Sequence, residues 1–155
     1  MLLTILLSIM MMAGLFLLLL GGVGFVKNKK FFSSPERFKG QHAVGWMMIV
    51  LALVLMGGGV VLGAWDGIRH EFGFWQFALR FMTMLLLLKA FDVIFFDWIL
   101  LCNGGFNFFS HFYPETKAML GRHLFGFNKT AHIIHVILFV PSVLLLSWIC
   151  TLFCG

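Results

Sequence analysis

Hydrophobic residues occur in four long runs, separated by shorter segments that hold most of the charge. About 20 predominantly apolar residues are enough to cross the roughly 30 Å hydrocarbon core of a bilayer as a helix. Because the bilayer offers no water to backbone groups, such spans must be helical. The pattern therefore predicts an all-α membrane protein, a single-domain four-helix transmembrane bundle over residues 1–155. The predicted spans are residues 2–26, 43–65, 74–102 and 131–154.

Composition supports this class and argues against others. Hydrophobic residues make up 61% of the chain and charged residues only 11%, whereas soluble domains are about 25% charged. The net charge of +5 could suggest nucleic acid, but the basic residues lie in short segments between apolar runs, as membrane topology requires. We therefore expect a lipid bilayer as partner and no nucleic acid.

The basic residues also predict an orientation. The segments 27–42 and 103–130 together hold eight Lys or Arg, whereas 66–73 holds only Arg69. Since cytoplasmic loops carry an excess of Lys and Arg, both longer segments are predicted to be cytoplasmic and both termini extracytoplasmic, in a multi-pass protein of the cell membrane. The basic residues of the first segment are predicted to lie at the membrane surface: Lys27, Lys29, Lys30, Arg37 and Lys39.

Segment 103–130 is too rich in phenylalanine for a free linker. Pro114 followed by Glu115 is typical of a helix start, with a carboxylate at the positive end of the helix dipole. We predict a short interfacial helix over Pro114–Leu124, between the third and fourth spans. A re-entrant segment is the alternative.

Glycines indicate where two spans approach closely. Gly59 and Gly63 form a GxxxG pair in the second span, and Gly14 lies in the first. Small residues let helix backbones come together in a membrane. We predict that the first and second spans pack against each other, while the same motif could also support a homo-oligomer.

The third run carries charge where charge is unfavourable. A central ionised side chain costs at least about 2.5–3.5 kcal/mol on insertion scales, so it usually faces protein or water. Arg80 lies near the outer interface, where it can snorkel. On an α-helix, Asp92 lies about 60° to one side of Lys89 and Asp97 about 80° to the other. We therefore predict a polar intramembrane cluster of Lys89, Asp92 and Asp97, divided into a midplane Lys89–Asp92 pair and a lower Asp97.

This cluster has three interpretations: an ion pair that only orients helices, a proton or ion relay, or a site for a polar ligand or headgroup. A second candidate site consists of His132 and His135, spaced i, i+3 at the start of the fourth span, with Asp97 near the same membrane face. Two histidines with a carboxylate suit zinc or iron, and paired histidines suit haem. Alternatively, these histidines only hydrogen-bond to neighbouring helices.

The octapeptide Phe91–Trp98, FDVIFFDW, is followed by Pro114-Glu115-Thr116 and by HLFGFN at 123–128. This combination resembles a family of small four-span inner-membrane proteins of anaerobic bacteria. The resemblance implies a bacterial inner-membrane location and no activity. It includes Asp92 and Asp97 but not Lys89.

The sequence contains no nucleotide-binding glycine motif, no phosphate loop and no hydrolase nucleophile motif. We therefore predict a non-enzymatic protein without a cofactor, either a transporter- or channel-like subunit or an accessory of a larger membrane complex. The alternative is an integral-membrane enzyme or redox protein that binds zinc, iron or haem through His132, His135 and Asp97.

Overall fold

The computed structural model describes residues 1–22, 35–102 and 129–154. Within these ranges the chain is helical apart from short turns and ends, and it contains no strand. Helix α1 (Leu2–Phe16) continues as the π-helix η1 (Leu17–Gly22), and α4 (Phe74–Phe91) continues as the longer π-helix η2 (Asp92–Cys102). The other helices are α3 (Pro35–Arg69) and α6 (Lys129–Leu152). The predicted all-α, four-helix chain is confirmed, whereas the predicted interfacial helix and Lys27, Lys29 and Lys30 lie outside the described residues.

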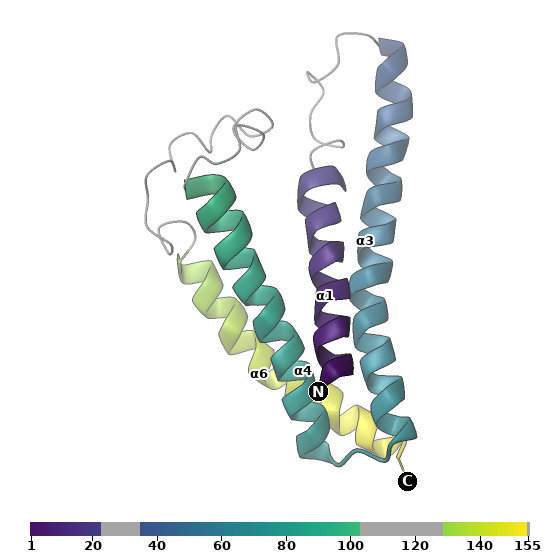
Figure 1. The fold of residues 1–155 in the computed structure, drawn as a ribbon, viewed down its shortest axis with the longest axis vertical. Helices are drawn as coiled ribbons and strands as arrows, with labels where there is room; N and C mark the ends of the chain where they lie inside the picture. Colours follow the sequence, from purple (N-terminus) through teal and green to yellow (C-terminus); the bar gives the residue numbers. More distant parts are fainter. Residues whose placement is uncertain (23–34, 103–128, 155) are drawn as a thin grey trace.

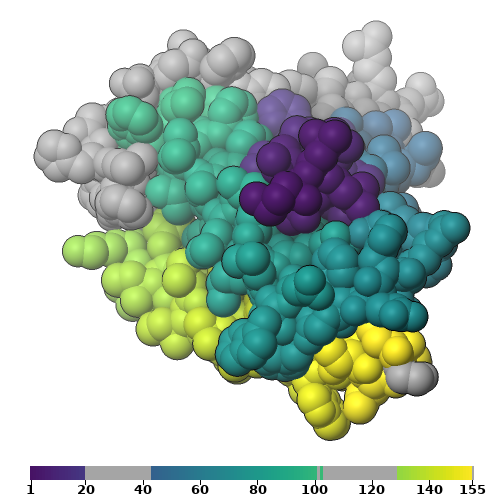
Figure 2. Space-filling model, turned by 60° about the horizontal axis from the view of Figure 1, so that its bottom comes forward, coloured from purple at the N-terminus to yellow at the C-terminus, as the bar shows by residue number. Residues whose placement is uncertain are grey.

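The helices form two side-by-side pairs, α1 with α3 and α4 with α6 (Figure 1). Both chain ends lie at the same end of the bundle as the α3–α4 turn, where the two pairs meet. Figure 2 looks onto this end, with α1 in purple, the α3–α4 region in teal and the end of α6 in yellow. Buried side chains of α1, α4 and α6 form the core here: Leu7, Met11, Phe77, Ala78, Phe81, Met84, Val143 and Cys150.

Three helical segments among the described residues are long and apolar enough to cross a membrane, namely Leu2–Leu19, Ala43–Arg69 and Lys129–Leu152. The predicted third span is helical throughout 74–102, but it is not one of these three. The bundle surface is also apolar, since Leu2, Met47 and Leu79 are 73%, 70% and 67% exposed. Soluble monomers rarely expose apolar surface on this scale.

Helix α3 begins at Pro35, eight residues before the predicted second span. Proline suits the first helical position, because its missing N–H has no intrahelical acceptor there. Its 35 residues correspond to a length of about 52 Å at 1.5 Å per residue, well beyond one hydrocarbon core. Arg37 and Lys39, predicted to lie in a loop, are therefore part of a helical extension.

Glycines allow the close contact between α1 and α3, which confirms the predicted pairing. A Cβ added at Gly59 would lie 2.6 Å from Met11 Cγ, and one at Gly63 would lie 3.5 Å from Leu7 Cδ1. At Gly14 the obstacle is backbone: an added Cβ would lie 2.9 Å from the Ala52 carbonyl oxygen. Real Cβ atoms essentially never come within 3.0 Å of another atom, so a side chain at Gly14 would force the two helices apart, whereas 3.5 Å at Gly63 is ordinary contact.

We expect Gly14→Ala to lower the melting temperature of the purified protein, with a loss of about 1–3 kcal/mol from overpacking. Gly57→Ala is the matched control, because a Cβ there meets nothing within 4 Å. Alanine favours a helix over glycine by about 1 kcal/mol, so the control should melt at the same temperature or higher. Equal losses in the two variants would show that close α1–α3 contact is not the cause.

Candidate functional site: a charged cluster between two helices

Lys89 is the centre of a buried polar cluster where α4 continues into η2. Its side chain is 10% exposed, and its Nζ donates a hydrogen bond to Asp92 Oδ2 at 2.6 Å. The same Nζ lies 3.4 Å from His135 Nδ1 on α6. The predicted i, i+3 pair is therefore present, and it also joins α4 to α6.

Asp97 and His132 form a second contact between the same two elements. Asp97 Oδ2 lies 2.7 Å from His132 Nε2, and the two side chains are 9% and 11% exposed. Asp97 is contributed by η2, and His132 lies near the start of α6. The contact is an ion pair when the imidazole is protonated.

The π-helical backbone brings these two contacts together. Five α-helical residues turn through about 500°, which would place Asp97 about 140° away from Asp92. In a π-helix the hydrogen-bonded turn runs from i to i+5, so Asp97 follows Asp92 one turn later on the same side. One donor atom each of Asp92, Asp97 and His132 lies within 4.8 Å of the other two. The two sites predicted from α-helical geometry are therefore one site.

The group of possible metal ligands also differs from the predicted one, because it contains only one of the two histidines. Asp97 and His132 come together as predicted. His135 instead lies beside the Lys89 ammonium, and Asp92 is the third donor of the group. The i, i+3 spacing of the two histidines would let both of them bind one metal ion. In the structure, however, the Lys89 ammonium lies beside His135, where that ion would have to bind.

Among the described residues, the formal charges of the cluster do not balance. With both carboxylates ionised and both imidazoles neutral, Lys89 supplies one positive charge and Asp92 and Asp97 supply two negative charges, which leaves −1. Unbalanced charge is strongly unfavourable in a low-dielectric interior. The cluster can therefore accept one further positive charge, either as a proton or as a bound cation.

A groove between α4–η2 and α6 lies beside the cluster. Its cavity has a volume of about 590 Å³ and is lined by Lys89 and His132 at the cluster and by Lys129 at the start of α6. The other lining residues are apolar: Leu86, Ala90, Val93, Ile94, Ile133, Val136 and Ile137. The surface of the groove is therefore almost entirely apolar, including the parts contributed by Lys89 and His132.

Aromatic side chains support η2 from the opposite side. Phe95 and Phe96 on η2 contact Phe16 of α1, with ring centroids 5.9 and 6.3 Å apart. Phe91 stacks on Phe95 with centroids 5.1 Å apart. Ring packing of this kind fixes the rotation of η2 between α1 and α6, and that rotation determines where Asp97 points.

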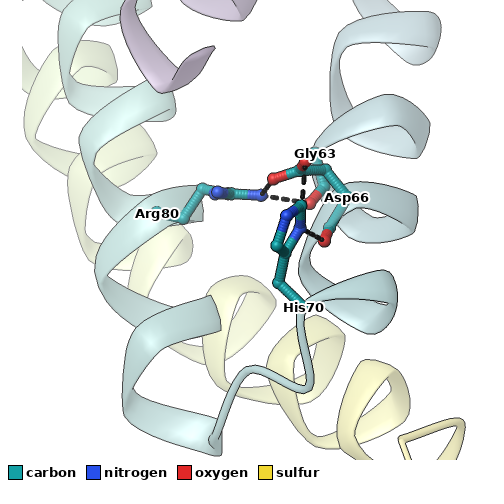
Figure 3. A network of polar contacts seen from close by, with 4 residues as sticks. All are labelled: Gly63, Asp66, His70 and Arg80. Atoms are coloured by element: carbon teal, nitrogen blue, oxygen red, sulfur yellow. Dashed lines mark hydrogen bonds and ion pairs between the residues drawn. The ribbon is translucent and has the colours of Figure 1, made fainter. Parts of the chain in front are cut away.

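A separate network closes the corner between α3 and α4 (Figure 3). Arg80 Nη1 donates to Asp66 Oδ2 at 2.7 Å and to the Gly63 carbonyl oxygen at 2.9 Å. Asp66 also contacts His70, and the Arg80 guanidinium lies 4.4 Å from the centre of the Phe72 ring. The prediction that Arg80 snorkels at the outer interface was wrong, because its side chain is 7% exposed and paired within the protein.

The sequence does contain a signal for this pair. Asp66 and Arg80 lie at equal distances on either side of Gly73, at the short connection between two antiparallel helices. Residues equally distant from such a turn lie side by side, and opposite charges at these positions favour an ion pair. The Arg80 network locks the corner and lies apart from the Lys89 cluster.

Comparisons of the chain with protein-family models, curated proteins and solved structures gave no match. The functional argument therefore depends on the charged cluster and on the helices that hold it.

Proposed function

We propose that the chain is a small polytopic integral membrane protein that binds a cation inside the bilayer and acts as a transporter- or channel-like subunit. The observation that carries the proposal is the buried cluster of the described residues, in which Asp92 pairs with the Lys89 ammonium and Asp97 pairs with His132. Ionisable groups in membrane spans commonly mark ion pathways and proton relays. The cluster belongs to one chain, so a homo-oligomer or a larger complex is not needed to complete it.

Membrane embedding is supported by the three long apolar helices and by the exposed apolar surface. An open groove lined mainly by hydrocarbon also fits acyl chains better than water. In the proposed topology α4–η2 also spans the membrane, in addition to the three long apolar helices. Its charged side chains lie on the side that contacts α6. The basic segments 27–42 and 103–130 lie in the cytoplasm and both termini lie outside, in the cell membrane.

Flux measurements on proteoliposomes test the proposal. Protons, sodium, potassium and divalent cations are offered in turn, and the wild type is expected to conduct at least one of them above the empty-liposome rate. Asp97→Asn should reduce that flux by about tenfold or more, because an interaction with a charged partner contributes about 1.5–3 kcal/mol. The variant keeps the shape of the side chain and removes its charge.

Glu71→Gln is the control, since Glu71 is an exposed acid in the turn between α3 and α4. It should conduct like the wild type. Wild-type liposomes that conduct none of these ions, or an Asp97→Asn variant that conducts as well as the wild type, would refute the proposal.

A further inference from the structure

Three side chains of the cluster have the geometry of an incomplete metal site. Donor atoms of Asp92, Asp97 and His132 all lie within 4.8 Å of one another. Around a tetrahedral metal ion at 2.0–2.2 Å from its ligands, neighbouring donor atoms are about 3.4 Å apart. The side chains would have to rotate to bring the three atoms to that separation, and a metal ion would part Asp97 from His132, whose atoms now lie 2.7 Å apart.

The donor set indicates the class of ion. Imidazole suits zinc and iron, whereas ligation by carboxylate alone favours magnesium, calcium or manganese. The described residues supply two carboxylates and one imidazole, and this set suits a divalent first-row transition metal. Three ligands from the described residues leave at least one tetrahedral position for water or another ligand, as in catalytic zinc sites.

The Lys89 ammonium competes with a metal ion for the carboxylate of Asp92. Its ammonium lies 2.6 Å from Asp92 Oδ2, so it neutralises one of the three donor residues. A divalent ion and an ammonium cannot share that carboxylate without strong repulsion. Building on the proposed cation-binding function, we infer that Asp92, Asp97 and His132 bind a divalent first-row transition metal, and that the Lys89 ammonium must leave Asp92 for the metal to bind.

Cobalt is a suitable probe, because Co²⁺ in a low-coordinate nitrogen and oxygen site absorbs visible light. The detergent-purified wild type is expected to bind one Co²⁺ per chain, and Mg²⁺ at the same concentration should not displace it. Asp97→Asn should lose the absorption. Lys89→Gln should bind Co²⁺ about tenfold more tightly or better, because the competing charge is gone.

Lys129→Gln is the matched control, since Lys129 lines the same groove but is exposed. Its Co²⁺ affinity should equal that of the wild type. An affinity unchanged or weakened in Lys89→Gln would overturn the inference, because a merely structural lysine does not compete with the metal. If Lys89→Gln does not fold, the rise in melting temperature on adding Zn²⁺ is measured instead. This rise is expected in the wild type and should be absent in His132→Gln. An equal rise in the two proteins would overturn the inference.

The two proposals can fail separately. If neither the wild type nor Lys89→Gln binds Co²⁺, but proton or monovalent flux depends on Asp97, the metal inference is wrong and the proposed function stands. If Co²⁺ binds as described but the protein conducts no cation, the metal site stands and the transport function is wrong.

Discussion

Replacing Arg80 by leucine is expected to lower the free energy of unfolding by about 3 kcal/mol, near the lower end of the range for breaking a buried ion pair. The guanidinium bonds to a carboxylate and a backbone carbonyl and stacks on an aromatic ring, and all three contacts disappear together. Of its side-chain contacts with the described residues, Asp66 keeps the one to His70. Because Asp66 is 20% exposed, water relieves part of its unpaired charge.

Denaturation with SDS in mixed micelles measures this loss. Asp66→Asn combined with Arg80→Leu should recover much of the stability, since no unpaired charge remains buried. Arg69→Leu is the control at the same end of the bundle. Its guanidinium lies 5.5 Å from the centre of the exposed Trp65 ring, a contact worth about 0.5–1 kcal/mol. If Arg80→Leu and Arg69→Leu have equal effects, the corner network does not hold α3 to α4.

Hydrophobic run length was enough to predict the helices. Each long run is helical where the structure describes it, and Gly14 and Gly59 lie where α1 and α3 touch. Both signals are local, because they depend on the length of one segment or the size of one side chain. The start of α3 at Pro35 could not be placed in the same way, since helix extensions beyond a span need not be apolar.

The shape of the site could not be predicted, because it depends on the hydrogen-bond register of one segment. Residues 92–102 have the composition of an ordinary apolar helix. Composition does not distinguish a helix with i to i+5 hydrogen bonds from one with i to i+4 hydrogen bonds. The contacts that go with the π register come from elsewhere in the chain. Phe16 contacts η2 from α1, and His132 meets Asp97 from α6. The five-residue spacing of the two aspartates was the available hint, and π-helical turns are frequent at functional sites.

Asp92 and Asp97 are therefore expected to act as one unit. Asp92→Asn and Asp97→Asn should each reduce cation flux at sub-saturating concentration by about tenfold or more. In the double variant the two fold-reductions in flux should not multiply. The first substitution already removes much of the cation binding that the second would otherwise remove. Residues in separate sites would instead give effects that add in free energy, so that the two fold-reductions multiply.

This double-mutant cycle is the most direct test of the charged cluster as a single cation site. The wild type, the two single variants and the double variant are reconstituted at equal protein density, and the initial cation flux is measured for each. We expect the double variant to conduct within a few-fold of the more impaired single variant, a coupling of about 0.5–3 kcal/mol. A double variant whose flux falls by the full product of the two single reductions would contradict the one-site account.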